Sequence, residues 1–384
     1  MLAAALGYAV VHPPALTAGG MDFNAFYCGS RILAAGENPY RYEPLRSCEH
    51  EHRWFAKPND VVAAPLPPYA LRLLTPIALL PYPQAGFLWF LLLLASALLV
   101  IWAILELTGL SIIVVGASMA IAVLLQSLPT GALAPIPLAL LCLAAVALTR
   151  ERWNAAAALL GVACIEPHVA APAALAAFVL VRELRVRLAV VGATLVALSL
   201  LPHGTALNFE YLTRVLPQQA RFELGSIVQF GLSSMLHNLG VPDNAALAIG
   251  SVQYALFIPL GIWLAARLRR QIPAAVVLVP IALAVTGGPY IHLTQIAAVL
   301  PLAFVVASRS SSPLAWAGVA LLTLPWNLLN AIAPTTLVVP PVAEVLTGAL
   351  SGQFPAGTTA YIANLLAYLG IACTLLGAAS RKPR

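Results

Sequence analysis

The residues best suited to chemistry lie in a polar, aromatic block near the start of an otherwise apolar chain. This block contains Asp22, Asn24 and Tyr27 and follows one short apolar stretch, so its carboxyl group is expected at a membrane surface. Ionisable groups there are costly to desolvate and are functional candidates for that reason. Partial desolvation also raises the basicity of a carboxylate, which suits a general base. The alternative is that Asp22 caps a helix, a common use of aspartate.

Two short turns elsewhere carry further ionisable and aromatic side chains. Glu166 and His168 flank a proline between two apolar segments, and a Gly-Gly-Pro-Tyr-Ile-His run at 287–292 joins two others. The second run supplies Tyr290 and His292. These turns matter because they interrupt long apolar stretches, where polar groups are rare.

The composition indicates a polytopic membrane protein. Hydrophobic residues make up 61% of the chain and charged residues 9%, and the mean hydropathy is +0.90, which excludes an ordinary soluble domain. A span needs about 20 apolar residues. On that measure we predict an all-α fold of about twelve transmembrane helices, near 1–16, 85–106, 110–127, 132–149, 153–165, 168–181, 187–202, 245–266, 273–287, 292–307, 313–333 and 359–379. The two helices between 153 and 181 can also be interpreted as one broken hairpin.

The distribution of charge predicts the topology. If the N-terminus is cytoplasmic, the inside loops contain 12 of the 20 basic residues and three of the 14 acidic ones, so the net charge of +6 divides into +9 inside and −3 outside. This is the positive-inside pattern. The basic balance is therefore a topology signal, and nucleic acid is not an expected partner.

We expect a single integral membrane domain over 1–384 whose polar segments lie outside the membrane on one side. These are a first extracytoplasmic loop at 17–84 with interfacial helices, a second segment at 203–244 and a third near 334–358. Amphipathic helices are predicted at 24–35 and 71–80. Residues 1–16 lack a leading basic residue and are short for a span. That favours a first membrane helix that has lost its start over the core of a signal peptide.

This topology places Asp22, Glu166, His168 and His292 at one membrane level. Their convergence from distant parts of the sequence is a stronger signal than any single motif.

Cysteine and histidine residues at 48–52 suggest a metal site, since thiolate and imidazole are zinc ligands. Without a second ligand cluster the signal is weak, and an exposed loop is the favoured interpretation. Cys28 and Cys48 both lie in the first outer segment and could form a disulfide in an oxidising compartment, which competes with metal binding. We predict neither a metal nor a cofactor.

Several motifs together resemble glycosyltransferase family 87, polytopic enzymes of the type-C glycosyltransferase fold. The matching pieces are the Asp-Phe…Phe-Tyr block from Asp22 to Tyr27, Ala-Ala-Gly-Glu-Asn-Pro-Tyr at 34–40, and Pro-Pro-Tyr at 67–69 followed by Leu-Thr-Pro at 74–76. Further pieces are the Pro-His turn at 167–168, Ser226 with its apolar neighbours, and Gly-Pro-Tyr-Ile-His at 288–292. The resemblance covers about residues 20 to 300, and the first block is the most specific.

The resemblance implies an inverting transfer of a hexose, with mannose as the sugar, from a polyprenyl-phosphate-sugar donor to a glycolipid or glycan acceptor. An acid in the first external loop acts as base in such enzymes, and Asp22 is the matching position. His292 could donate to the leaving phosphate or orient the base, His168 could contact phosphate, and Glu166 could hold an acceptor hydroxyl. The family often has lysine before the proline of this turn, so Glu166 is a departure. For His292, His168 and Glu166 alike, a purely structural role is the alternative.

Cations and aromatic rings complete the predicted site. Arg31 is the best placed cation for the phosphate, since arginine matches phosphate oxygens in a fork, with Arg72, Arg214 and Arg221 as further candidates. The rings of Tyr27, Tyr40, Tyr69 and Tyr290 could stack on sugars, although anchoring at the membrane interface is their ordinary use.

We therefore predict a glycosyltransferase of a bacterial cytoplasmic (inner) membrane whose site faces the periplasm or cell exterior. The rival is a membrane transporter or lipid flippase for a polyprenyl-linked or amphipathic substrate. Transporters favour internal repeats and ionisable residues at the membrane midplane. The sequence shows no such repeat, and its polar residues gather on one face.

Overall fold

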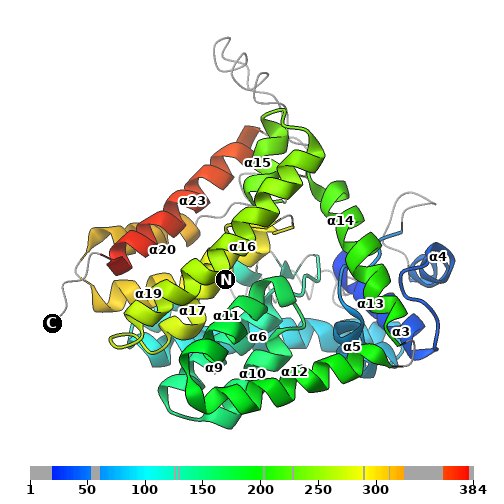
Figure 1. Cartoon of the computed structure of the whole chain (residues 1–384), viewed down its shortest axis with the longest axis horizontal. Coiled ribbons are helices and arrows are strands. Elements are labelled where there is room, and N and C mark those ends of the chain that lie inside the picture. The colour runs from blue at the N-terminus through cyan, green and yellow to red at the C-terminus, as the bar shows by residue number, and fades with distance from the viewer. Residues whose placement is uncertain are drawn as a thin grey trace.

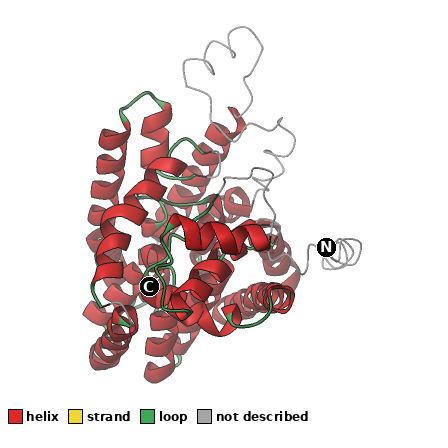
Figure 2. Cartoon of the chain, turned by 90° about the vertical axis from the view of Figure 1, so that its right-hand side faces the viewer, coloured by secondary structure: helices red, strands yellow, loops and turns green. Residues whose placement is uncertain are grey.

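The chain is helical in all the parts that can be described. The computed structural model describes residues 20–52, 61–124, 127–128, 130–201, 204–226, 229–288, 290–310, 312–323 and 358–379. Within these ranges helices are joined by loops, without any strand (Figure 2). Gln229 and His292 form an isolated bridge. The expected all-α fold is confirmed for these residues. The spans expected at 1–16 and over the second half of 313–333 lie outside them, as does the outer segment near 334–358.

Three helices build the described part of the first outer segment: α3 (Met21–Ala34), α4 (Tyr42–Glu51) and α5 (Pro68–Ala78). The helix expected at 24–35 is α3, and its apolar residues Phe23, Tyr27 and Leu33 are buried. They pack into a hydrophobic cluster with α5 and the start of the next helix. The aromatic face of α3 therefore faces protein.

A bundle of apolar helices forms the larger core. It consists of α6 (Tyr82–Thr108), α7 (Ile112–Met119), which continues as a π-helical turn (Ala120–Leu124), α9 (Pro135–Thr149), α10 (Trp153–Ala163), α11 (Pro167–Leu180), α12 (Arg185–Leu200), α16 (Asp243–Leu268), α17 (Ala275–Ala284), α19 (Leu300–Arg309), α20 (Pro313–Thr323) and α23 (Thr358–Ala379). The segment at 153–181 is two helices joined by a turn. That turn carries Glu166.

Shorter helices lie in the connections that position the polar residues. They are α13 (Ala206–Glu210), which runs through a π-helical turn (Tyr211–Val215) into α14 (Leu216–Glu223), then α15 (Leu232–Asn238) and α18 (Leu293–Ile296). In Figure 1, α3, α4, α5, α13 and α14 lie at the right of the molecule, while α19, α20 and α23 lie at the left.

Local sequence explains the longest helix, α6. It begins with prolines at 81 and 83, which fit a first helical turn, and it ends at Gly109 in the left-handed conformation with φ of 66°. One face is buried around Trp89, Leu93 and Val100, while Leu98 and Trp102 on the other face are exposed. Large apolar side chains exposed along a helix are what lipid contact requires.

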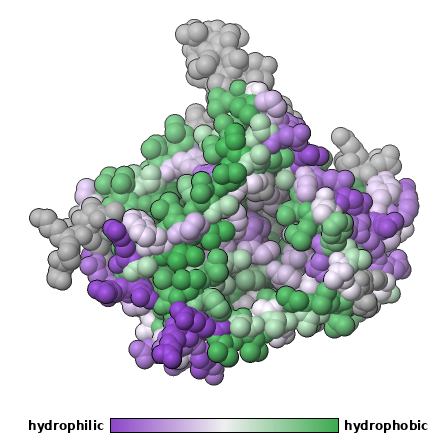
Figure 3. Space-filling model, viewed as in Figure 1, coloured by the Kyte–Doolittle hydropathy of each residue, from purple (hydrophilic) through white to green (hydrophobic). Residues whose placement is uncertain are grey.

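Only part of the expected membrane architecture is confirmed. Among the described residues, α6 and α16 are long and apolar enough to cross a membrane, and the shorter apolar helical stretches, including Asn364–Ala378 within α23, have 10 to 17 residues. The helix expected at 292–307 is present as one continuous helical stretch, made of α18, a 3₁₀ turn and α19, with Pro301 in the first turn of α19. Twelve full spans are thus not confirmed. Apolar side chains cover the visible face along α16, and hydrophilic ones gather at the lower left and at the right (Figure 3).

The loops with many arginines lie together at one end of the bundle. Arg150 pairs with Glu106, Arg269 donates to the carbonyl of Leu180, and Arg309 donates to the carbonyl of Gln271 at 2.7 Å. Each of these contacts joins two loops that the charge pattern assigns to the same side. The grouping agrees with the expected topology.

One expectation for the first outer segment is wrong. Residues 42–51 form helix α4, so the 48–52 stretch is no exposed loop, and Glu49 is buried. A disulfide joins Cys48 to Cys28 of α3, which removes the Cys48 thiolate as a metal ligand. Within the described chain, no group of three His, Cys, Asp or Glu residues is arranged to hold a metal ion. Helix α4 has few apolar residues, and the cross-link explains how so polar a helix docks.

We expect Cys48→Ser to lower the free energy of unfolding by about 3 kcal/mol, because the cross-link closes a loop of 20 residues. Thermal unfolding in detergent, followed by tryptophan fluorescence, measures the change. Cys373→Ser is the control, since that thiol is free and half-buried. A wild-type melting temperature that does not respond to reductant would contradict the prediction.

Candidate active site

Helix α3 begins where it does because Gly20 fits a backbone geometry that other residues avoid. Gly20 has φ of 84° and ψ of 172°, a region open almost only to glycine. A Cβ built there would lie 2.3 Å from the carbonyl carbon of Thr130. The next turn is fixed by a hydrogen bond from the Asp22 backbone N–H to the Thr130 carbonyl oxygen, at 2.9 Å. The α3 start is thus pinned to the turn at 130.

Asp22 does not cap this helix. The N-cap residue is Gly20, and Asp22 lies in the first turn, so the capping alternative is wrong. Burial raises the pKa of Asp22 to about 6. The charge of His292 and a side-chain hydrogen bond with Thr130 oppose this rise, while Glu223 adds to it. A carboxylate with such a pKa is still ionised at neutral pH and is a stronger base than an ordinary aspartate.

A second group of polar residues surrounds the turn between α10 and α11. Gln295 accepts the backbone N–H of His292 at 2.7 Å through its side-chain oxygen, which turns its amide nitrogen toward Glu166 and His168. That nitrogen donates to Glu166 and lies 2.7 Å from Nε2 of His168. An amide NH₂ only donates, so Nε2 of His168 accepts and the neutral ring carries its proton on Nδ1.

One carboxyl oxygen of Glu166 accepts a hydrogen bond, and the other has no hydrogen-bond partner. Its Oε1 accepts from Gln295, whereas its buried Oε2 has no hydrogen-bond partner. Burial raises the pKa of Glu166 to about 7, with Gln295 and His292 opposing the rise and Asp22 adding to it. A buried oxygen without a partner is costly, so a substrate hydroxyl at this point would be stabilised.

His292 links these groups to the second outer segment. Its Nε2 lies 3.6 Å from a carboxylate oxygen of Glu223, and its ring centroid is 4.8 Å from that of Tyr290. The Tyr290 ring in turn meets that of His168 edge-on at 6.0 Å. Two histidines, one tyrosine and three carboxyl groups are therefore within interaction range. We call Asp22, Glu166, His168, Glu223, Tyr290, His292 and Gln295 the outer polar cluster.

The structure brings four widely separated sequence predictions together. Asp22, Glu166, His168 and His292 were expected at one level, and they are neighbours in the outer polar cluster. Tyr290 joins them. Tyr69 lies at the border, where its hydroxyl donates at 2.7 Å to the carbonyl of Cys164, two residues before Glu166.

Other predicted site residues lie elsewhere. The hydroxyl of Tyr27 donates to the carbonyl of Leu80 at 2.9 Å, and that of Tyr40 to the carbonyl of Leu66 at 2.7 Å. Both rings are buried in the smaller hydrophobic cluster. Arg31 donates to the Tyr27 hydroxyl at 2.6 Å. Nine residues along a helix turn a side chain by roughly 180° and move it about 13 Å from the first, so Arg31 lies at the opposite end of α3 from Asp22.

The remaining candidate arginines also have partners away from the outer polar cluster. Arg72 donates to the carbonyl of Leu201, Arg214 to Glu210 and the carbonyl of Tyr40, and Arg221 to Asn244. Among the described contacts of the cluster, His292 is therefore the side chain that can carry a positive charge.

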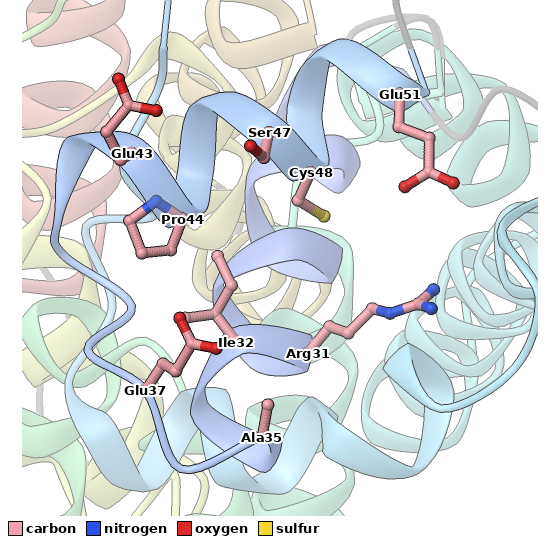
Figure 4. Close-up of a pocket in the computed structure, with 9 residues that line it drawn as sticks. All are labelled: Arg31, Ile32, Ala35, Glu37, Glu43, Pro44, Ser47, Cys48 and Glu51. Carbon is pink, nitrogen blue, oxygen red and sulfur yellow. The ribbon is translucent and has the colours of Figure 1, made fainter.

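A cavity of about 540 Å³ lies between α3 and α4, and it is separate from the outer polar cluster (Figure 4). Arg31 and Glu37 approach it from the α3 side, and Glu43, Ser47 and Glu51 from α4. None of the cluster residues lines it. This cavity therefore adds nothing to the geometry around Asp22.

Sequence reasoning missed Glu223 and Gln295. Glu223 ends a polar helix with no recognisable motif, so only the fold shows its proximity to His292. Gln295 lies three residues after the N-cap residue His292. That spacing is typical of a capping box, and the position could have been found from it.

The arrangement can support displacement at a carbon atom. A carboxylate of raised pKa suits removal of a proton, a partnerless carboxyl oxygen suits holding a hydroxyl, and an imidazole beside carboxylates suits a developing negative charge.

The comparison with known families agrees with this chemistry. The sequence model of glycosyltransferase family 87 matches residues 66–288, more than half of the chain. No curated protein and no solved structure matches. The matched range contains Glu166, His168 and Glu223, whereas Asp22 precedes its start by 44 residues and His292 follows its end by four. The resemblance seen in the motifs is confirmed. The chain therefore belongs to glycosyltransferase family 87 and is a glycosyltransferase with apolar, membrane-associated helices.

Proposed function

We propose that the protein is an inverting hexosyltransferase that uses a polyprenyl-phosphate sugar as donor and a glycolipid or glycan as acceptor. The observation that carries this proposal is the meeting of Asp22, Glu166 and His292 from three distant segments. Mannose is the proposed sugar on the family resemblance alone. The site faces the periplasm or cell exterior of a bacterial cytoplasmic membrane, in keeping with the charge pattern, and the donor tail enters sideways from lipid.

In the proposed reaction Asp22 takes the proton of the acceptor hydroxyl. The hydroxyl oxygen forms a bond to the anomeric carbon on the face opposite the phosphate, and the bond from that carbon to the phosphate oxygen breaks. The electron pair leaves with polyprenyl phosphate, whose added negative charge His292 stabilises. Because this single displacement occurs on the face opposite the leaving phosphate, the configuration at the anomeric carbon inverts.

Glu166 is proposed to orient the acceptor. Its free Oε2 lies in the same cluster as Asp22, and the raised pKa places a titratable carboxyl where an acceptor hydroxyl can share its proton. The family often has a lysine at this position, which implies a cationic contact with phosphate. Glu166 is proposed to contact the acceptor in its place. The position therefore supports an acceptor contact in preference to a phosphate contact.

We expect Glu166→Gln to raise the acceptor KM about tenfold and to change kcat less than threefold. The amide keeps the hydrogen bond from Gln295 but replaces the free oxygen by a donor, which removes about one hydrogen bond to the acceptor. Initial rates over a range of acceptor concentrations at saturating donor measure the effect. A change confined to the donor KM would contradict an acceptor role.

The proposed function is tested by transfer of radiolabelled sugar from synthetic polyprenyl-phosphate hexoses. Membranes carrying wild-type protein should form a labelled covalent product, and membranes carrying Asp22→Ala should not. Uptake of the donor into vesicles without any covalent product would overturn the proposal in favour of a transporter or flippase. Donors with mannose, glucose or galactose in parallel identify the sugar.

A further inference from the structure

The carboxylate of Glu223 is held in place against the imidazole of His292. Its Oε2 lies 3.6 Å from Nε2 of His292, while its other oxygen accepts a hydrogen bond from Gln219 at 3.0 Å. Gln219 is one turn earlier on α14 and also shares a side-chain hydrogen bond with Tyr290. Glu223 is therefore oriented from its far side, and its free oxygen points at one nitrogen of the histidine.

The backbone around His292 is attached to the same outer segment. The side-chain oxygen of Gln229 accepts the Ile291 N–H at 3.1 Å, and the Phe230 N–H donates to the Ile291 carbonyl at 2.6 Å. The segment that follows α14 thus fixes the main chain of His292, and the end of α14 fixes its ring. A side chain that is constrained from both directions has a defined orientation.

The distance between Glu223 and the ring of His292 is too long for a hydrogen bond. Nitrogen and oxygen at 3.6 Å exceed hydrogen-bonding distance, and Nε2 of His292 is buried without a hydrogen-bond partner. The charge of Glu223 accordingly attracts the proton on Nε2, but the two groups form no hydrogen bond. The Nε2–H group of His292 has a defined orientation and no acceptor, so it can donate a hydrogen bond to an incoming oxygen atom.

Other groups also face His292. Asp22 approaches from α3, Glu166 from the α10–α11 turn, and Tyr290 from its own loop, while His168 of α11 lies beyond Tyr290. Burial alone lowers the pKa of His292, but Glu223 first, and then Asp22 and Glu166, raise it above its ordinary value. Of these carboxyl groups, Glu223 is the one that lies within ion-pair distance of the ring.

We propose that Glu223 is a positioning residue that keeps the proton of His292 on Nε2, so that the ring can donate to the leaving phosphate. The proposal rests on the proposed transfer reaction and extends it to a residue of the second outer segment. Glu223 acts through His292 and touches no substrate itself. Without its charge, the buried ring would lose its proton at a lower pH, and the leaving group would meet a neutral imidazole.

The substitution Glu223→Gln separates charge from shape. Because Gln219 donates to one oxygen of Glu223, the new amide should keep its oxygen there and turn its NH₂ toward His292. An NH₂ group repels a proton on Nε2 of His292. Glu223→Asp keeps the charge at a slightly greater distance. Asp243→Asn is the matched control, since Asp243 pairs with His237 at 2.9 Å on the exposed surface.

The test titrates His292 directly and independently of sugar transfer. Diethyl pyrocarbonate reacts with the neutral imidazole, so peptide mass spectrometry of the full-length protein over a range of pH gives the midpoint for His292. A carboxylate near a partly buried ionisable group moves its pKa by about one unit or more. We expect Glu223→Gln to lower the His292 midpoint by about one unit, Glu223→Asp to restore most of it, and Asp243→Asn to leave it unchanged.

The rate of transfer provides the second measurement. The alkaline limb of the pH profile of kcat should move to lower pH by about one unit in Glu223→Gln. In Glu223→Asp it should lie close to its wild-type position. An unchanged His292 midpoint in Glu223→Gln, or a midpoint in Glu223→Asp as low as in Glu223→Gln, would overturn the proposal. If the midpoint shifts as expected while the wild-type protein transfers no sugar, the positioning of His292 stands and the proposed reaction fails.

Discussion

Asp22→Asn should reduce kcat for sugar transfer by about a thousandfold while the protein stays folded. The amide occupies the same space and can keep its contact with Thr130, but it cannot accept a proton from the attacking hydroxyl. General base catalysis contributes roughly 10²–10⁴ in rate, and the predicted loss lies within that range. Steady-state transfer with saturating donor and acceptor measures kcat, and thermal unfolding in detergent shows whether the fold is intact.

The pH dependence of transfer by the wild-type protein should reflect the protonation of Asp22. A base works when it is deprotonated, so kcat should fall tenfold per unit as the pH drops below about 6, the pKa to which burial raises Asp22. Thr130→Val supplies a directional check. The side-chain hydrogen bond with Thr130 lowers the pKa of Asp22, so its removal should move this acid limb to higher pH. An acid limb near pH 4, the range of an ordinary aspartate, would contradict the assignment.

Gly20→Ala should lower transfer at least a hundredfold although residue 20 carries no functional group. A Cβ at this position would lie 2.3 Å from the Thr130 carbonyl carbon and 2.6 Å from the Gly131 nitrogen, and both atoms belong to the backbone and cannot move aside singly. The positive φ of Gly20 adds strain. Together these should displace the start of α3 and Asp22 with it. A displacement of about 1 Å in a reacting group can cost about a hundredfold in rate.

Gly36→Ala is the matched control for this prediction. Gly36 follows the other end of α3 with φ of 80°, but a Cβ there meets nothing within 4 Å. The substitution should cost about 1 kcal/mol of stability from backbone strain and leave kcat within about threefold of wild type. Equal kcat values for Gly20→Ala and wild type would show that the turn at 130 does not position Asp22.

The sequence predicts the apolar helices well because their signal is local. The expectations at 85–106 and 245–266 correspond to α6 and α16, and those at 153–165 and 168–181 correspond to α10 and α11. Continuous apolar residues of sufficient length specify such helices without reference to the rest of the fold. Interruptions are harder to predict. The 3₁₀ turn between α18 and α19 falls inside an apolar run, where hydropathy alone indicates one regular helix.

The polar parts of the fold depend on contacts distant in sequence. Helix α4 has little apolar surface of its own and is attached to α3 by the disulfide between Cys28 and Cys48. Glu223 reaches His292 across 69 positions of the chain. The disulfide could be raised as a possibility because both cysteines lie in the first outer segment, whereas the contact of Glu223 with His292 has no local pattern and could not be predicted from the residues alone. Charge distribution did predict which turns share a side, and it brought Asp22, Glu166, His168 and His292 together in advance.

Arg31 shows the limit of proximity in sequence. It was expected near Asp22 because both lie in one short segment, yet the helix that connects them places their side chains on opposite faces and at opposite ends. The phosphate contact proposed for an arginine thus passes to His292. The positive charge available near the proposed leaving group is then one that depends on pH, unlike that of an arginine.

The central claim is that the outer polar cluster is the active centre for sugar transfer, with Asp22 as its base. The most direct test is single-turnover transfer by the purified protein in lipid nanodiscs, preloaded with a synthetic polyprenyl-phosphate mannose and mixed with an excess of acceptor extract. We predict a covalent product of inverted anomeric configuration from the wild-type protein, and a rate constant about a thousandfold lower for Asp22→Asn with the donor still bound. Equal rate constants for the two proteins, or a product of retained configuration, would contradict the account.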